Sequence, residues 1–249
     1  MSTRPEERLQ PSVYCGRLLV AAICLAAVSA SGCGPVAHLQ NADGVRLYQQ
    51  GYYDAAQQRF QQAMYNAPQD ADAFYNLAAT FHRLGNMNQQ ESYLDQAEQY
   101  YHQCLDRDPN HNDCHRGLAV LLVENSRSEE AFALLESWAD RNPALPDPHI
   151  ELARLFEEFG DRTAAKEHLV AALTVDPDNS RALAALGSIR EQLGETVQAL
   201  ADYQRSLAAN GMQEDLRARV AALQTAVAPY PMAGPNGTRT VITTGPPLR

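Results

Sequence analysis

The stretch of sequence that decides the fold is residues 146–179, PDPHIELARLFEEFGDRTAAKEHLVAALTVDPDN. It contains two runs of apolar residues with a spacing near 3.6, which keeps side chains on one face of an α-helix. Gly160 lies between the runs and suits the end of the first helix, because glycine adopts a positive φ without steric cost. Pro177 closes the second run, since proline cannot continue the preceding turn. The stretch therefore predicts an antiparallel helical hairpin.

The same pattern recurs along most of the chain. Its clearest marker is an alanine in the second helix, at intervals of 41, 34, 34 and 34 residues: Ala56, Ala97, Ala131, Ala165 and Ala199. A small side chain at this position allows the paired helix to approach closely. The period divides residues 37–213 into five units: 37–70, 71–111, 112–145, 146–179 and 180–213. A fixed period of this size predicts an all-α solenoid in which each hairpin buries its apolar face against its neighbours.

These units resemble the tetratricopeptide repeat, as residues 149–177 show with His149, Leu152, Ala153 and Phe156, then Ala165, Leu169 and Pro177. The resemblance implies a right-handed solenoid whose first helices line a concave groove that binds protein segments. In this register the candidate groove residues are Asn41, Tyr48, Tyr75, His82, Arg116 and Arg154. Eight of the 11 tyrosines lie in the first two units. We favour Tyr48 and Tyr75 as contacts, because tyrosine is enriched at interfaces.

Two units depart from the repeat. Unit 37–70 has Gln40 and Asp43 where large apolar residues belong, so its first helix is expected to be a polar end cap or only marginally formed. The unit at 71–111 is seven residues longer than the others. We expect Gly85 to mark its turn and residues 87–103 to form one uninterrupted helix. The extra residues then form either a protruding interaction site or a neutral insertion.

The last apolar face of a solenoid needs a cover. Leu216, Val220, Leu223 and Val227 predict one amphipathic capping helix over residues 214–228. The tail at 229–249 is rich in Pro, Gly and Thr and is expected to be disordered.

The N-terminus has the composition of an export signal. Three arginines precede an apolar run at 18–30, which is too short to span a bilayer. Ala30-Ser31-Gly32-Cys33 resembles the lipobox of bacterial lipoproteins, although that family usually has leucine at the position of Ala30. The resemblance implies that residues 1–32 are removed, that Cys33 carries lipid and that residues 33–36 form a tether. The alternative is an ordinary signal that leaves Cys33 as a free thiol.

The residue after the candidate lipidated cysteine bears on location. Gly34 is not the aspartate that retains lipoproteins at the inner membrane, so the resemblance favours an outer-membrane lipoprotein facing the periplasm. An inner-membrane or secreted protein remains open.

Charge and motifs exclude several function classes. The formal net charge is −10 and the basic residues are scattered, so binding to nucleic acid is disfavoured. The sequence contains no phosphate-binding glycine loop, no nucleophile elbow and no HExxH pair. We therefore expect neither enzymatic activity nor a cofactor.

Two cysteines and three histidines gather around one predicted turn: His102, Cys104, His111, Cys114 and His115. Zinc takes thiolate and imidazole ligands, but the nine residues between Cys104 and Cys114 do not fit the spacing of structural zinc sites. Export permits a disulfide between these two cysteines. A disulfide, a metal site and reduced thiols all remain open.

The leading hypothesis is a membrane-anchored scaffold of the cell envelope that binds another envelope protein through its concave groove. Its architecture resembles lipoproteins that assist assembly of the type IV pilus secretin and those that dock peptidoglycan enzymes. The alternative is a metal- or redox-active envelope protein that uses the cysteine and histidine cluster.

Overall fold

The computed structural model describes residues 33–227, and all regular elements in that range are α-helices, as the sequence predicts. Their bounds are α2 (Cys33–Gln49), α3 (Tyr53–Asn66), α4 (Ala71–Asn88), α5 (Glu91–Arg107), α6 (Asn112–Glu124), α7 (Ser128–Arg141), α8 (Asp147–Glu158), α9 (Arg162–Val175), α10 (Ser180–Gln192), α11 (Thr196–Ala209) and α12 (Glu214–Val227). Within the described part, no helix is both long enough and apolar enough to cross a bilayer. The predicted signal segment and C-terminal tail lie outside the described residues.

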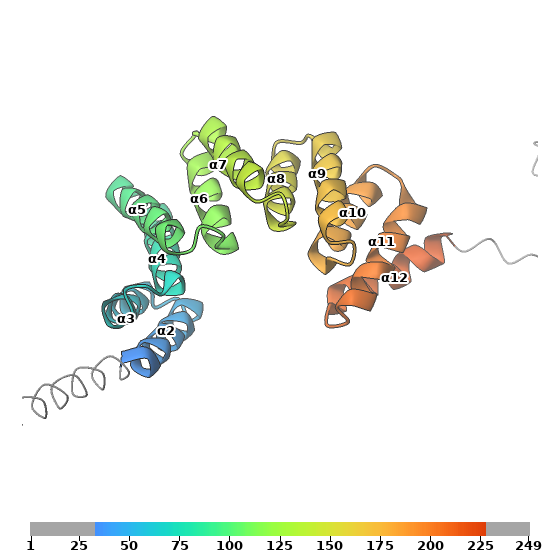
Figure 1. The fold of residues 1–249 in the computed structure, drawn as a ribbon. Helices are drawn as coiled ribbons and strands as arrows, with labels where there is room; N and C mark the ends of the chain where they lie inside the picture. The colour runs from blue at the N-terminus through green and yellow to red at the C-terminus, as the bar shows by residue number, and fades with distance from the viewer. Residues whose placement is uncertain (1–32, 228–249) are drawn as a thin grey trace, which may run out of the picture. The chain divides into compact units, whose positions relative to one another are not determined.

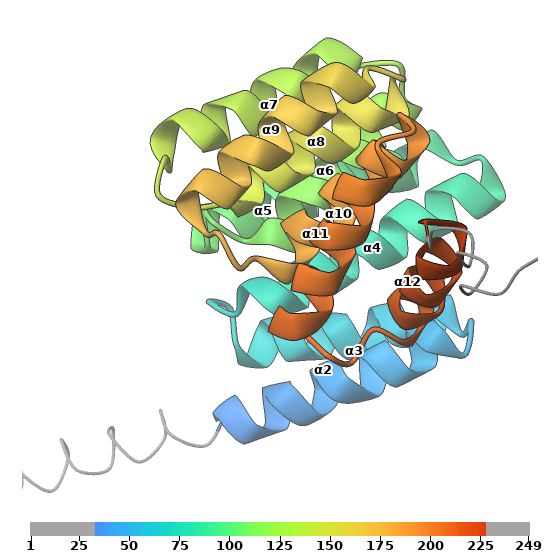
Figure 2. The ribbon, with the colours of Figure 1, turned by 90° about the vertical axis from the view of Figure 1, so that its right-hand side faces the viewer.

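The described residues divide into two compact units, with the boundary between Asp140 and Arg141. In the first unit, α2 pairs with α3 and α4 pairs with α5, and consecutive hairpins pack together (Figures 1 and 2). In the second unit, α8 pairs with α9 and α10 pairs with α11. These pairs are the helical hairpins that the period predicts.

Close contact between the two helices of a hairpin depends on a small residue facing a large one. A Cβ added to Gly44 in α2 would lie 2.4 Å from Phe60 Cε1 in α3. A Cβ added to Gly187 in α10 would lie 2.6 Å from Tyr203 Cδ1 in α11. The large ring occupies the space that a glycine leaves, so both helix axes come close together.

The turn inside each hairpin has one residue with a left-handed backbone. This position is held by Gly51 (φ 82°), Gln89 (φ 52°), Ser126 (φ 61°), Gly160 (φ 82°) and Gly194 (φ 79°). Three of the five are glycine, the residue for which this conformation carries no steric penalty. Gly85, which the sequence predicts as the turn residue of the long unit, instead lies within α4 and packs against Leu94.

The seven extra residues of the long unit are shared between its two helices. Gln89 follows Gly51 by 38 residues, whereas the last three turn residues are 34 apart. Gln89 also precedes Ala97 by eight residues, whereas Gly160 precedes Ala165 by five. α4 thus gains four residues and α5 gains three, which is about one turn for each helix. The prediction of one helix over residues 87–103 is wrong, because the chain turns at Gln89 and Gln90.

The first helix of the first repeat is fully formed. α2 runs for 17 residues despite its polar positions, and it packs along α3. Ala37 and Gly44 lie at the contact, while Gln40 forms a hydrogen bond to Asn66 (Nδ2–Oε1 2.7 Å). Gln40 is therefore a polar link between helices rather than a break in α2.

α12 closes the apolar face of the last hairpin. Val220 and Leu223 are each 8% exposed and pack with Ala199 and Tyr203 of α11. The helix occupies the place where the sequence predicts a cap.

Candidate functional site

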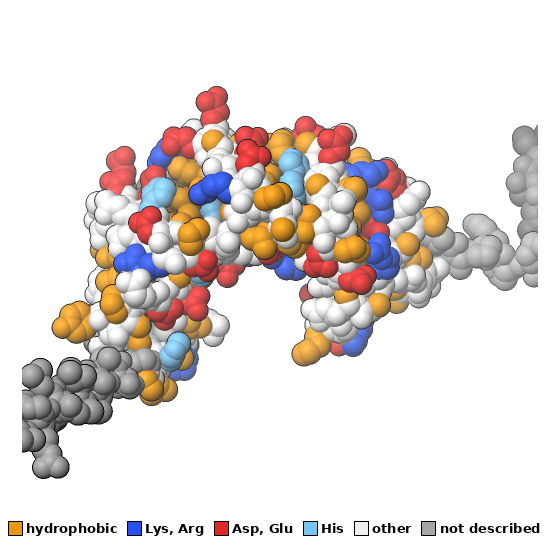
Figure 3. Space-filling model, viewed as in Figure 1, with side chains coloured by type: hydrophobic (Ala, Val, Ile, Leu, Met, Phe, Trp, Pro, Cys, Tyr) orange, Lys and Arg blue, Asp and Glu red, His pale blue; other side chains and the backbone are white. Residues whose placement is uncertain are grey.

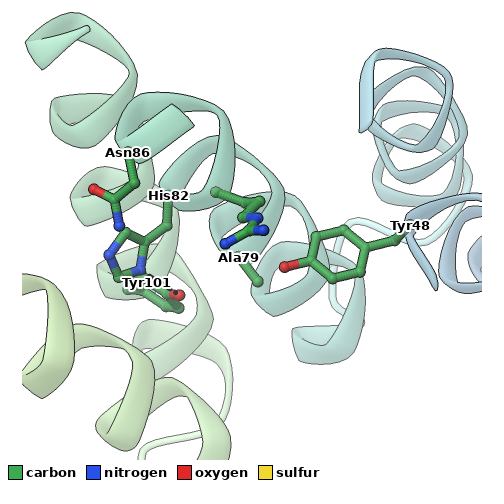
Figure 4. Close-up of a pocket in the computed structure, with 6 residues that line it drawn as sticks. Tyr48, Ala79, His82, Asn86 and Tyr101 are labelled. Atoms are coloured by element: carbon green, nitrogen blue, oxygen red, sulfur yellow. Dashed lines mark hydrogen bonds between the residues drawn. The ribbon is translucent and has the colours of Figure 1, made fainter. Parts of the chain in front are cut away.

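The first unit carries a pocket of about 160 Å³ between helices α2, α4 and α5. It is lined by Tyr48, Ala79, His82, Arg83, Asn86 and Tyr101. Figure 4 shows His82, Asn86 and Tyr101 gathered at one side, with Tyr48 pointing toward them from α2 across Ala79. The pocket thus has aromatic walls and polar edges, a combination suited to a protein side chain.

One wall of the pocket is held by a network between α4, α5 and α6. His82 is buried, and its Nε2 lies 2.7 Å from Glu124 Oε2, while its Nδ1 lies 3.4 Å from the Tyr101 hydroxyl. Asn86 Nδ2 donates to the same Glu124 oxygen at 2.9 Å. Burial alone would raise the pKa of Glu124, but the hydrogen bonds from Asn86 and His82 lower it below its usual value. A carboxylate is thereby fixed beside the pocket in its charged form.

The opposite side of the pocket presents a cation. Arg83 is exposed, and its guanidinium lies 5.8 Å from the centre of the Tyr53 ring. Tyr53 in turn packs edge-on against Tyr48, with ring centres 5.1 Å apart. Among residues 33–227, no carboxylate lies within ion-pairing distance of Arg83. Its charge is therefore open to an acidic group from outside the chain.

The remaining predicted contacts of the first unit, Asn41, Tyr75 and Arg116, lie on α2, α4 and α6. Asn41 Oδ1 accepts a hydrogen bond from Asn76 at 3.0 Å, which links α2 to α4. Tyr75 is partly buried and packs against Tyr101 and His111, with ring centres 6.4 and 5.5 Å away. Burial raises the pKa of Tyr75 above its ordinary value.

Arg116 completes this set on α6. Its Nη1 lies 3.1 Å from Asp113 Oδ1 within the same helix, so much of its charge is balanced. We call the exposed surface formed by Tyr48, Tyr75, Arg83, Arg116 and the pocket the groove surface. It carries the cations of Arg83 and Arg116 beside the carboxylates of Glu124 and Asp113.

Arg154 lies on α8 of the second unit. Its Nε is 3.3 Å from Oε2 of Glu151, whose side chain is only 1% exposed. Arg181 Nη2 contacts the other oxygen of that carboxylate at 2.7 Å. Two guanidinium groups therefore compensate one buried carboxylate, which is the condition for burying such a charge at tolerable cost. Arg154 serves at least this local role.

The sequence register did not identify Arg83, Asn86 or Glu124 as pocket residues. Residues 75, 79, 82 and 86 follow the spacing of one helix face, so this spacing points to Asn86. The glycine at position 85 nevertheless predicts a turn and the end of the helix before Asn86, whereas α4 continues to Asn88. The contact of Glu124 with His82 depends on how α6 packs against α4, and no local pattern reveals it.

The predicted cysteine and histidine cluster is divided in the structure. Cys104 at the end of α5 and Cys114 at the start of α6 form a disulfide, with Cα atoms 6.5 Å apart. His111 caps α6, with its Nδ1 accepting from the Cys114 N–H at 3.2 Å and its Nε2 3.0 Å from Asp72 Oδ1. The ligand atoms of Cys104, His111 and Cys114 lie within 4.8 Å of one another. A metal at this point would require both thiols to be reduced, because a bridged sulfur is not a thiolate.

The other two histidines of the cluster lie elsewhere. His102 is exposed, and its Nε2 is 3.9 Å from Glu98 on its own helix. His115 is buried and stacks on Trp138, with ring centres 3.9 Å apart, while its Nε2 donates to the carbonyl of Pro109 at 3.0 Å. His102 and His115 therefore do not join the group formed by Cys104, His111 and Cys114.

Comparison with known proteins identifies the repeat. Models described as "Tetratricopeptide repeat" match residues 42–97, 90–155 and 150–215, and so cover residues 42–215 without a gap. The human protein "Tetratricopeptide repeat protein 8" is 29% identical over 96 residues, an alignment that covers 39% of this chain and 16% of the human protein. The chain thus aligns with only a small part of that relative's length.

Solved structures show the same fold. The thermophilic TPR protein TTC0263 of Thermus thermophilus is 27% identical with a TM-score of 0.56, over 76% of this chain and 99% of that one. The pilF protein of Pseudomonas aeruginosa is 19% identical with a TM-score of 0.51, over 79% of this chain and 86% of that one. The second likeness concerns the fold alone. The chain belongs to the tetratricopeptide repeat family.

Proposed function

We propose that this protein is a membrane-anchored scaffold of the cell envelope, which binds a segment of another envelope protein on its groove surface. The tetratricopeptide fold is consistent with a protein–protein interaction scaffold. The observation that carries the proposal is the pocket between Tyr48 and Tyr101, with Arg83 exposed beside it. The anchor rests on the sequence around Cys33.

The pocket limits the chemistry of the bound segment. Its volume of about 160 Å³ fits one apolar or aromatic side chain, which would pack against the tyrosine rings. Because Arg83 has an exposed guanidinium, an acidic side chain or a terminal carboxylate next to the inserted residue would form an ion pair with it. Glu124, which is already charged, disfavours a second acidic group on its own side of the pocket. The segment therefore carries one apolar residue and one acidic group on the Arg83 side.

The envelope part of the proposal rests on the N-terminal sequence alone. A signal segment followed by a lipidated Cys33 would hold the repeats at the outer membrane, where they face periplasmic proteins. In this proposal the scaffold assists the assembly of an envelope machine, such as a pilus secretin or a peptidoglycan-synthesising complex. A metal or redox function of the Cys104 and Cys114 pair is not favoured.

Partner recovery from cross-linked membranes tests the proposal. The variant Tyr48→Ala with Arg83→Ala removes one wall of the pocket and its cation. The control, Tyr52→Ala with Arg59→Ala, removes the same residue types from exposed positions outside the pocket. We expect the first variant to lose its cross-linked partner and the control to retain it, with both helical by circular dichroism. Equal recovery from both variants would place the binding site elsewhere.

A further inference from the structure

One end of the α2–α3 hairpin carries no charged residue. Residues 33–42 and 60–69 contain no Asp, Glu, Lys or Arg, although such residues make up 20% of the chain. The two segments lie side by side, because the Asn66 amide donates to Gln40 at 2.7 Å. The uncharged end of the hairpin is thus a single surface built from the start of α2 and the end of α3.

This end also exposes large apolar side chains. Val36 is 46% exposed, Leu39 is 70% exposed and Tyr65 is 86% exposed, whereas Ala37 between the first two is buried. Figure 3 shows hydrophobic side chains exposed over α2 and α3 at the lower left. We call the surface of Val36, Leu39 and Tyr65 the hairpin-end surface.

The position of this surface in the chain indicates what covers it. α2 begins at Cys33, so residues 33–36, which the sequence predicts as a tether, are helical, and no linker separates the proposed lipidated residue from the helix. With a rise of 1.5 Å per residue, Val36 and Leu39 follow Cys33 by about 4.5 and 9 Å along the helix axis. Acyl chains on Cys33 would therefore bring both side chains to the depth of the lipid headgroups.

We propose that the hairpin-end surface lies in the interface of the bilayer that holds the lipid on Cys33. Aliphatic side chains gain free energy by leaving water there, and tyrosine is enriched at this depth because its ring is apolar and its hydroxyl is polar. The absence of acidic residues matters in a chain with a net charge of −10, because acidic groups are repelled by anionic lipids. The contact fixes the orientation of α2 and α3 at the membrane. This inference rests on the lipidation that we propose for Cys33.

Quenching of a tryptophan by brominated lipids tests the contact. The only native tryptophan, Trp138, is fully buried and gives a constant background. The lipidated protein with Tyr65→Trp is purified from membranes, and its N-terminal lipid is verified by mass spectrometry. It is then reconstituted into vesicles of phosphatidylethanolamine and phosphatidylglycerol with lipids brominated along the acyl chains. The matched control is Tyr52→Trp, since Tyr52 is also exposed but lies at the other end of α3, about 20 Å away.

We expect the tryptophan at position 65 to shift its emission to shorter wavelength and to be quenched by the brominated lipids. The tryptophan at position 52 should keep the long-wavelength emission of an indole exposed to water and should not be quenched. Adding Leu39→Asn to Tyr65→Trp should reduce the quenching.

Each contrary outcome has a distinct meaning. If the lipid is present but position 65 is not quenched, the membrane contact is wrong and the anchor stands. A shift to shorter wavelength without quenching would show that protein covers this surface, which also overturns the contact. If mass spectrometry finds no lipid on Cys33, the proposed anchor is wrong and the membrane contact falls with it.

Discussion

His82 Nε2 lies 2.7 Å from Glu124 Oε2, so a buried imidazole of α4 holds a half-exposed carboxylate of α6 at the edge of the pocket. This contact joins two neighbouring repeats of the first unit at the candidate binding site. It makes the shape of the pocket dependent on the packing of one helix pair against the next.

Replacing His82 by Ala tests this link. The change removes a buried ring beside Tyr101 and a hydrogen bond to a charged group, so we expect a loss of about 1–3 kcal/mol in the free energy of unfolding. Denaturant titration measures this loss. The control is Glu124→Gln, which keeps the shape of the side chain and should cost less, because that side chain is 46% exposed. An unchanged stability in His82→Ala would show that the contact does not hold α4 to α6.

Stability should also depend on pH where α12 caps the second unit. The hydrogen bond from Arg219, together with that from Tyr203, lowers the pKa of Glu191 below its ordinary value of 4.5. A depressed carboxyl pKa means that the contact stabilises the folded state above the ordinary pKa and is lost as pH falls through the folded one. We therefore expect the protection of the α12 amides, measured relative to their intrinsic exchange rate at each pH, to fall below pH 4.5 and to stay high at neutral pH.

A substitution gives the control for this pH effect. Arg219→Ala should lower the protection of the α12 amides at neutral pH and remove the further loss of protection between neutral pH and acid. Arg217→Ala should do neither, because Arg217 pairs with Glu214 of its own helix. Faster exchange in both variants would mean that Glu191 has no special part in docking α12.

The close helix contacts predict different costs for two glycines. Gly187→Ala would place a Cβ 2.6 Å from the Tyr203 ring, and such overpacking costs about 1–3 kcal/mol. Gly211→Ala meets nothing closer than 3.7 Å, so its melting temperature should stay near that of the wild type. Thermal unfolding by circular dichroism compares the two. Equal melting temperatures would contradict the close packing of α10 on α11.

These residues show what the sequence could predict and what it could not. The hairpins follow from a repeating local pattern, so residues such as Ala165 and Pro177 identify them directly. The turn of the long unit was misplaced because Gly85 has the residue type of a turn, while Gln89 adopts the left-handed backbone. Gly85 serves instead as space for Leu94, a contact between helices that residue type alone does not indicate.

In the candidate site, too, some residues follow from local sequence spacing and others only from packing between repeats. Tyr48, Tyr75 and His82 lie on one face of their helices, and that spacing can be read from the chain. Glu124 reaches His82 only through packing between repeats, 42 residues apart in sequence. The sequence also does not indicate that Arg83 has no carboxylate partner among residues 33–227, because that depends on the positions of all nearby carboxylates in the folded chain.

The pairing of Cys104 and Cys114 predicts a dependence on reductant. A disulfide that closes so short a segment contributes about 2–4 kcal/mol. We expect reduction to lower the melting temperature of the wild-type protein, and Cys104→Ser with Cys114→Ser to make it insensitive to reductant. Alkylation of the denatured, unreduced protein counts free thiols. Labelling of both residues before reduction would contradict the disulfide.

Site-specific photo-crosslinking at position 48 tests the central claim most directly, because Tyr48 forms a wall of the pocket. A photoreactive phenylalanine analogue at this position in the membrane-anchored protein should give one discrete adduct with an envelope protein. The adduct should disappear when Arg83→Ala is added, and the same analogue at position 52 should not form it. An adduct of equal strength from position 52, or none from position 48, would contradict the account.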